Sequence, residues 1–132
     1  MPLGHLGLNV PDLVRAKAFY DQFMPLVDYE PLFARDDEFA YRPAQEKVGT
    51  WIFFYPATES ADYSRLRLGL QHLAFMVKTR AAVHVVHEWA VGAGHEIVHP
   101  PQEFPQYHEG YYATFLLDPH GFMLEVVCHR DR

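Results

Sequence analysis

The stretch LGLQHLAFMV, residues 68–77, decides the fold that this sequence predicts. Its apolar part, Leu70–Val77, is interrupted by His72. A nearly equivalent stretch, GHLGLNV, covers Gly4–Val10 and carries His5 in the same place. The two histidines lie about half a chain length apart. The sequence therefore predicts two similar modules, each beginning with one of these strands.

The first module reads as a strand, a helix and three further strands. Apolar and polar residues alternate in Leu3–Val10, which predicts a half-buried strand. Asp12 is a predicted N-cap, and apolar residues at helical spacing predict a helix from about Leu13 to Met24 that ends before Pro25. The strands expected next are Tyr29–Ala34, Glu38–Arg42 and Thr50–Tyr55. The last is nearly all aromatic or β-branched, so we expect it to be central.

The second module repeats this order after a polar linker, Pro56–Leu68. The strand Leu70–Val77 is followed by a helix that Thr79 caps and that Gly92 and Gly94 end. Helical spacing predicts that Val83, Val86 and Ala90 share one face of this helix. A strand then runs into a Pro100-Pro101 loop, and the turn DPHG joins the last two strands. These three strands are predicted at Glu96–His99, Tyr111–Leu117 and Phe122–Cys128.

This repeated order favours an α+β sheet with helices on one face. The length of 132 residues predicts one domain, 1–132, with modules at about 1–57 and 69–132 joined by a linker at 58–68. The net charge is −6 and no basic patch is visible, which argues against nucleic acid. The single cysteine, Cys128, and the lack of a signal peptide or a membrane-length apolar run predict a cytoplasmic protein.

Three side chains of the metal-ligand type fall on the predicted strand face opposite the helices. They are His5, His72 and Glu125, a two-histidine, one-carboxylate set that suits Fe, Mn, Ni, Co or Zn and leaves positions open for substrate. A charge in an apolar strand is costly unless it is paired or metal-bound. Each residue also has an ordinary structural explanation, as a satisfied polar group or an edge-strand charge.

The same face carries an apolar and aromatic lining that suits an apolar or aromatic small molecule, although packing alone would also explain it. The residues predicted to contact substrate are Trp51, Phe53, Tyr55, Met76, Phe115 and Met123. Tyr111 and His108, in or beside the loop before the last hairpin, are candidates for proton transfer. For His108 the alternative is an exposed loop histidine.

Three motifs, GHLGLNVPDL, LQHLAFMV and GYYATFLLDPHGFMLEVV, resemble the vicinal oxygen chelate superfamily. That superfamily includes glyoxalases, extradiol dioxygenases, fosfomycin-resistance enzymes and bleomycin-binding proteins. The resemblance covers nearly the whole chain, and DPHG followed by MLE is its most specific part. It implies paired βαβββ modules forming a cupped sheet around a metal, with the family's ligand positions falling on His5, His72 and Glu125.

The chain also departs from each named activity of that superfamily. The fourth ligand position of glyoxalases falls on Phe53, which cannot bind a metal. Gly49-Thr50-Trp51 stands where extradiol dioxygenases have an acid/base histidine. Phe115 stands at the position of their active-site tyrosine. A threonine of fosfomycin enzymes is replaced by Gly7.

The sequence thus leaves two hypotheses open. The first is a divalent-metal enzyme, of the dioxygenase type or the glyoxalase and lyase type, acting on a small oxygenated substrate. The second is a small-molecule binding or resistance protein of the bleomycin-binding type. Because single-domain relatives commonly pair, the resemblance also implies a homodimer.

Overall fold

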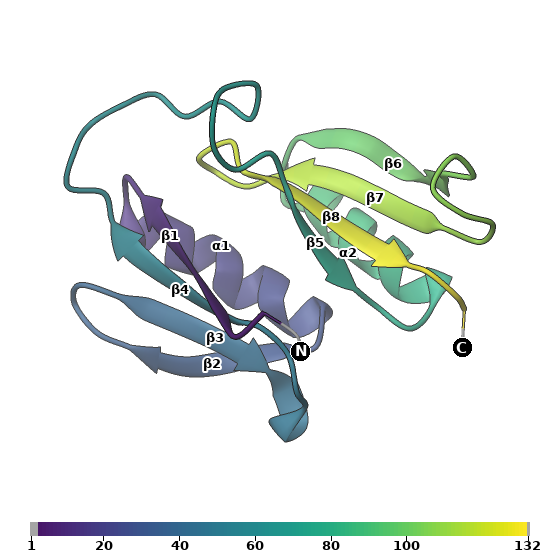
Figure 1. Ribbon diagram of the computed structural model, residues 1–132, viewed down its shortest axis with the longest axis horizontal. Coiled ribbons are helices and arrows are strands. Elements are labelled where there is room, and N and C mark those ends of the chain that lie inside the picture. Colours follow the sequence, from purple (N-terminus) through teal and green to yellow (C-terminus); the bar gives the residue numbers. More distant parts are fainter. Residues whose placement is uncertain (1–2, 132) are drawn as a thin grey trace. The chain divides into compact units, whose positions relative to one another are not determined.

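The fold repeats one arrangement of strands and a helix twice along the chain. A computed structural model describes residues 3–131 (Figure 1). The chain divides into two compact units, Met1–Asp62 and Tyr63–Arg132. Each unit contains a strand, a helix and three strands, so the predicted α+β class and the βαβββ repeat are confirmed. Residues 57–72, between the last strand of one unit and the first of the next, contain no helix or strand.

Unit 1 has one central strand that is parallel to its edge neighbour. Its strands are β1 (His5–Val10), β2 (Tyr29–Ala34), β3 (Phe39–Pro43) and β4 (Trp51–Pro56), with α1 (Leu13–Leu26) after β1 and a short 3₁₀ turn at Ala44–Glu46. The strand order is β1-β4-β3-β2, with β1 and β4 parallel and the other pairs antiparallel. The expectation that the aromatic strand β4 is central to its sheet is confirmed.

Helix α1 begins where the sequence predicted and ends two residues later. The Asp12 carboxylate accepts a hydrogen bond from the Arg15 backbone N–H at 3.1 Å, as an N-cap should. The prediction that the helix ends before Pro25 is wrong, because α1 includes Pro25 and ends at Leu26. A proline this close to the end removes only one hydrogen bond, and full burial of Met24 holds the last turn against the sheet.

Unit 2 has the same topology. Its strands are β5 (Leu73–Met76), β6 (Ile97–Glu103), β7 (Tyr112–Leu117) and β8 (Met123–Cys128), with α2 (Arg80–Gly92) after β5. The strand order is β5-β8-β7-β6, and β5 is parallel to β8. Thr79 caps α2 as predicted, its hydroxyl accepting from the Ala82 backbone N–H at 3.1 Å. Gly94, at φ 80°, follows the helix end.

Strand β5 is shorter than the predicted Leu70–Val77. Its partner β8 begins only at Met123, because the backbone groups of Phe122 are already used in the preceding turn. Phe122 N–H donates to the Asp118 carboxylate, and its carbonyl accepts from Asp118 N–H, both at 2.9 Å. The carbonyl of Leu70 accepts from the Tyr63 hydroxyl instead of joining a ladder. His72 therefore lies just before the strand rather than within it.

Strand β6 is longer than the predicted Glu96–His99. It continues through Pro100 and Pro101, which the sequence placed in a loop, to Glu103. Two features make the prolines acceptable. β6 is at the sheet edge, where one side of the strand needs no N–H donor, and its pairing with β7 shifts register between His99 and Gln102.

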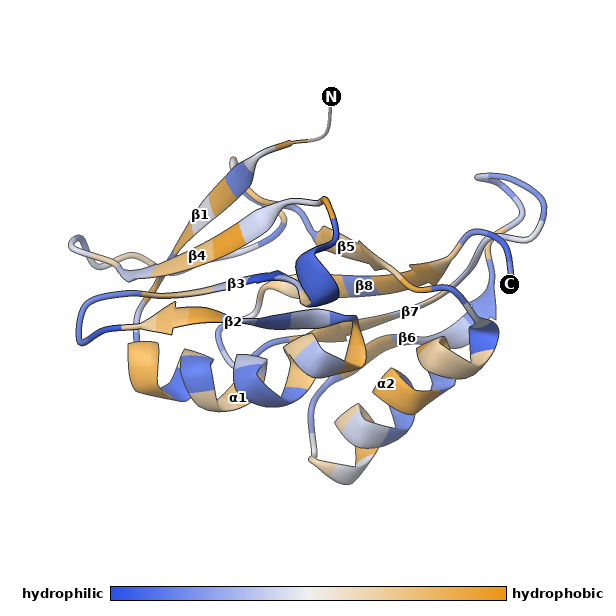
Figure 2. Cartoon of the chain, turned by 90° about the horizontal axis from the view of Figure 1, so that it is seen from below, coloured by the Kyte–Doolittle hydropathy of each residue, from blue (hydrophilic) through white to orange (hydrophobic). Residues whose placement is uncertain are grey.

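Each helix packs an apolar face on its own sheet. Figure 2 shows alternating hydrophobic and hydrophilic bands along α1 and α2. In α2 the buried residues are Val83, Val86 and Ala90, the three that helical spacing had placed on one face. Among residues 3–131, no helix is both long enough and apolar enough to span a membrane.

Candidate functional site

The candidate site in unit 2 centres on a buried carboxylate. Glu125 lies in the middle of β8 and is 2% exposed. In the sheet it pairs with Phe115 on β7 and Ala74 on β5. Its face of the sheet, opposite α2, also carries a small apolar cluster that includes Phe115 and Met123. A carboxylate in such surroundings requires partners that compensate for lost hydration.

Two side chains contact the two oxygens of Glu125 separately. His72 Nε2 lies 3.3 Å from Oε1, and the Tyr111 hydroxyl donates to Oε2. The other ring nitrogen of His72, Nδ1, contacts Gln71 Oε1, to which it donates as N–H. A neutral His72 would then present the lone pair of Nε2 to a carboxylate oxygen. A proton or a metal cation shared by His72 and Glu125 removes that repulsion, so this pair fits a metal ion chemically.

Tyr111 is a hydrogen-bond donor at this site. Burial raises its pKa above the ordinary value of 10.0, and the hydrogen bond to Glu125 raises it further because a phenolate would repel the carboxylate. The phenol therefore stays protonated near neutral pH. Its ring contacts four aromatic neighbours, edge-on in all cases but the tilted contact with Tyr107, namely Phe104, Tyr107, His108 and His129.

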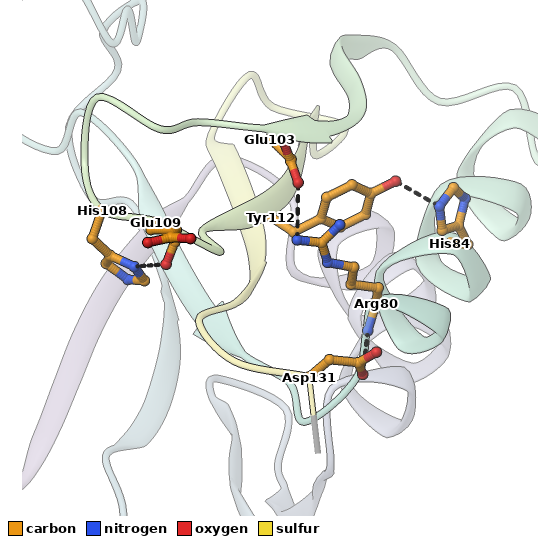
Figure 3. A network of polar contacts seen from close by, with 7 residues as sticks. All are labelled: Arg80, His84, Glu103, His108, Glu109, Tyr112 and Asp131. Atoms are coloured by element: carbon orange, nitrogen blue, oxygen red, sulfur yellow. Dashed lines mark hydrogen bonds and ion pairs between the residues drawn. The ribbon is translucent and has the colours of Figure 1, made fainter.

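His108 belongs to a pair of histidines beside Tyr111. Its Nδ1–H donates to the Glu109 carbonyl at 2.8 Å, an interaction visible in Figure 3. Its Nε2 lies 3.0 Å from Nδ1 of His129, and the two rings stack. His129 is not among the residues that the sequence predicted for the site. Its position four residues after Glu125, on the same side of β8, is the signal that would have placed it here.

The candidate residues of unit 1 form a separate aromatic group. The His5 ring packs edge-on against Phe53 with 5.5 Å between centroids, and Phe53 stacks with Tyr55. Trp51, at the start of β4, is exposed. The Tyr55 ring lies over Gly7, where a Cβ would come within 3.2 Å of Tyr55 Cε2. Unit 1 thus provides one imidazole and an apolar wall.

Strand register makes Phe53 and Glu125 equivalent. In unit 1 the residue two positions after His5 is Gly7, which pairs with Phe53. In unit 2 the residue two positions after His72 is Ala74, which pairs with Glu125. The histidine of unit 1 therefore has an aromatic ring where that of unit 2 has a carboxylate.

The structure brings most of the predicted residues together within their own units. His72, Glu125, Tyr111, Phe115 and His108 gather in unit 2, as do His5, Phe53 and Tyr55 in unit 1. Met123 belongs to the apolar cluster beside Glu125, and Met76 is 73% exposed. Within either unit, residues 3–131 contain no group of three His, Cys, Asp or Glu side chains that could hold a metal ion.

A second polar network lies where β7 presents its other face, toward α2. The Arg80 guanidinium lies over the Tyr112 ring and pairs with Glu103 at 3.1 Å (Figure 3). The Tyr112 hydroxyl contacts His84 Nε2 at 2.7 Å. Because Tyr112 follows Tyr111 in the chain, the two rings point to opposite faces. This network joins α2 to β6 and β7 and has no contact with Glu125 among the interactions of the described residues.

Comparisons with known proteins agree with this geometry. The model of the Glyoxalase/Bleomycin resistance protein/Dioxygenase superfamily matches residues 3–126. The uncharacterized protein YqjT of Bacillus subtilis (strain 168) is 25% identical over 127 residues, covering 94% of this chain and 96% of that protein.

Solved structures share the fold. A glyoxalase-type protein from Bacillus halodurans has a TM-score of 0.80 at 24% identity, with 96% of this chain and 94% of that one covered. Lactoylglutathione lyase from Agrobacterium tumefaciens has a TM-score of 0.68 at 19% identity (95% and 91% covered). FosX, a genomically encoded fosfomycin resistance protein of Listeria monocytogenes, has a TM-score of 0.70 at 20% identity (97% and 93% covered).

Proposed function

The chain belongs to the Glyoxalase/Bleomycin resistance protein/Dioxygenase superfamily, and we propose that it is a divalent-metal-dependent enzyme acting on a small, apolar or aromatic oxygenated molecule. The proposed ligands are His5, His72 and Glu125. The observation that carries the proposal is the buried Glu125 carboxylate, contacted by His72 on one oxygen and by Tyr111 on the other. Burying a carboxylate costs a large desolvation free energy. A functional role for Glu125 would explain why the fold accepts that cost.

Structural neighbours support an enzyme of this class. One is a lactoylglutathione lyase and another a fosfomycin resistance protein. The superfamily name itself spans glyoxalases, resistance proteins and dioxygenases, so membership alone does not select the reaction. The reaction types we propose are ring-cleaving dioxygenation, or lyase or isomerase chemistry on a keto compound.

A bound divalent ion would supply Lewis-acid polarisation of a substrate oxygen. The rest of the chemistry falls to the chain. His72 and Glu125 would hold the ion, and Tyr111 orients the Glu125 carboxylate through its hydroxyl. The phenol has a single O–H, which donates to Glu125, so Tyr111 would serve as a donor to a substrate oxygen only by exchanging that partner. His108 contacts the Tyr111 ring but makes no hydrogen bond to its hydroxyl among the described residues.

The residues around Glu125 favour an apolar substrate. Phe115 packs near His72, and both Phe115 and Met123 belong to the apolar cluster of unit 2. Such walls exclude water and strengthen interactions with the developing charge. The other proposed substrate contacts are Trp51, Phe53, Tyr55 and Met76.

A second candidate function is metal-free binding of a small molecule. Two observations favour it. Within either unit, residues 3–131 contain no group of three donor side chains placed to hold a metal ion, and Phe53 occupies the place in unit 1 that Glu125 has in unit 2. In this case the aromatic faces would bind a ligand and Glu125 would serve only as a hydrogen-bond acceptor.

Metal analysis of protein purified without chelator separates the two functions. We expect about one equivalent of divalent metal per chain, and loss of that metal in His72→Ala and in His5→Ala. His84→Ala is the matched control, because His84 contacts Tyr112 on the other face of β7. Absence of metal from the unmodified protein, or unchanged metal content in His72→Ala, would contradict the enzyme proposal and favour the binding protein.

Two further properties stay predictions. We propose that the protein acts in the cytoplasm and that it forms a homodimer. Light scattering of the purified chain tests the second, since a dimer has twice the 15.3 kDa mass of one chain.

A further inference from the structure

A small hollow in unit 2 lies at the ends of two parallel strands. It has a volume of about 190 Å³ and is lined by Met76, Val77, Lys78, His129 and Arg130. Strands β5 and β8 run side by side and end in the same direction (Figure 1). The hollow therefore combines an apolar floor from the end of β5 with basic groups that follow both strands.

Within residues 3–131, the two cations of this hollow, Lys78 and Arg130, have no carboxylate partner. Basic side chains that do form ion pairs in the described part of the chain include Lys17, Arg35, Arg42, Lys47 and Arg80. Among residues 3–131, the side chains of Lys78 and Arg130 take part in no ion pair or hydrogen bond. The protein has a net charge of −6, yet Lys78 and Arg130 place two unpaired positive charges beside this one small hollow.

Neighbouring charged residues are engaged elsewhere. Arg80 pairs with Glu103 and lies over Tyr112 (Figure 3). The Asp131 carboxylate accepts from the Arg80 backbone N–H at 3.2 Å, at the start of α2. Neither residue lines the hollow.

His129 connects the hollow to the candidate site. Its Nδ1 is occupied by His108, so Nε2 is the ring nitrogen left for a ligand. Its ring packs on Tyr111, whose hydroxyl donates to Glu125. His129 follows β8 and is four residues from Glu125, a separation of about 13 Å where the backbone stays extended.

We propose that this hollow binds an oxyanion, a carboxylate or phosphate group, carried at the far end of an apolar substrate whose other oxygens reach Glu125. This inference depends on the proposed function only because it calls the bound molecule a substrate. The hollow itself is a binding site for an oxyanion attached to an apolar body. Lys78 and Arg130 would supply the charge, and Met76 and Val77 the apolar contact.

The size of the hollow agrees with this assignment. Sites that enclose a whole small ligand usually measure about 300–1,000 Å³. A hollow of about 190 Å³ instead accepts one end group, leaving the remainder of the molecule to lie along the sheet toward Tyr111 and Glu125. An apolar body about 13 Å long, with oxygens at both ends, matches the spacing along β8.

The test uses the full chain, labelled with ¹⁵N and treated with EDTA so that no metal is required. The probes are 4-phenylbutyrate, phenyl phosphate and the neutral 4-phenylbutanol. We expect at least one anionic probe to shift the amide signals of residues 76–78 and 129–130, and to bind at least tenfold more tightly than the alcohol. Raising the salt concentration to about 0.5 M should weaken that binding several-fold, because exposed charges are screened.

Variants identify the charges involved. Lys78→Gln and Arg130→Gln should each weaken the anionic probe about three- to tenfold, and the double variant more. Arg15→Gln is the matched control, because Arg15 on α1 is exposed and its side chain has no ion pair within residues 3–131. Equal binding of alcohol and anions, signal changes only elsewhere, or a double variant equal to Arg15→Gln would overturn the proposal. Since the measurement is made without metal, its failure is distinguishable from failure of the metal proposal, which metal content alone decides.

Discussion

The two units are built alike but use the same position for different chemistry. Both place a histidine at or just before the first strand, and both pair the residue two positions later with the centre of the last strand. In unit 1 that pair is Gly7 and Phe53, and in unit 2 it is Ala74 and Glu125. One unit therefore presents an aromatic wall and the other a polar centre. The comparison teaches that the βαβββ repeat fixes where a site lies, and single residues decide what it can do.

The largest effect should come from removing the polar half of this comparison. Glu125→Gln keeps the size of the side chain and its acceptor for Tyr111, but removes the charge. We expect metal content measured by mass spectrometry to fall at least 100-fold, with loss of any metal-dependent activity. Glu103→Gln, an exposed carboxylate on β6, is the control and should leave metal content unchanged. Unchanged metal content in Glu125→Gln would contradict the claim that Glu125 binds the metal and thereby distinguishes unit 2 from unit 1.

A medium effect is expected at the paired residues, Gly7 and Ala74. Gly7→Val should lower the free energy of unfolding by about 1–3 kcal/mol, because even a Cβ there lies 3.2 Å from the Tyr55 ring. Ala74→Val, at the equivalent exposed position of unit 2, should change it by less than about 0.5 kcal/mol. Urea unfolding of both variants measures the difference. Equal free energies of unfolding for the two variants would show that the Tyr55 ring moves aside without an energetic cost.

The smallest effect concerns a tyrosine and a carboxylate on the other face of unit 1. The Tyr41 hydroxyl donates to Asp21 at 2.7 Å, and burial, followed by this bond, raises the Tyr41 pKa above its ordinary value of 10.0. Tyr41→Phe should cost about 1 kcal/mol at neutral pH, measured by urea unfolding.

The same pKa shift predicts a pH dependence with a definite sign. Above pH 10 the unfolded chain loses the Tyr41 proton while the folded chain keeps it, so stability is full below pH 10 and falls as the pH rises further. Tyr41→Phe should make that fall shallower in unfolding curves between pH 8 and 11. Tyr107→Phe, whose residue is 61% exposed, should keep the slope of the unmodified protein. An unchanged slope in Tyr41→Phe would assign the alkaline loss of stability to other groups.

Local patterns predicted most of the elements because their causes are local. Asp12 and Thr79 cap their helices as expected, and apolar spacing identified the buried face of α2. The errors at Pro25 and at Pro100-Pro101 have one origin. In both cases burial or an edge position made a proline acceptable where its local preference favours a break.

The sequence indicated which residues of unit 2 lie near the candidate site, but not which of their atoms contact one another. Alternation along β8 predicted that Glu125 lies on the face opposite the helix, where it pairs with Phe115 on β7. His129 was not predicted for the site, although it continues the alternation of β8 one residue beyond the end of the strand. The division of the Glu125 oxygens between His72 and Tyr111 depends on neighbours 53 and 14 residues away in the chain, and no local pattern contains that information.

By itself the sequence determined the repeat, the strand and helix types and the superfamily, because alternation, caps and the DPHG turn are written in neighbouring residues. Tertiary structure alone decided the register that pairs Glu125 with Ala74 and Phe53 with Gly7. It also decided the protonated Tyr111 donor and the meeting of Lys78 with Arg130 at one hollow. The physical reason is that register, desolvation and charge proximity arise between residues distant in sequence, once backbone pairing has brought them together.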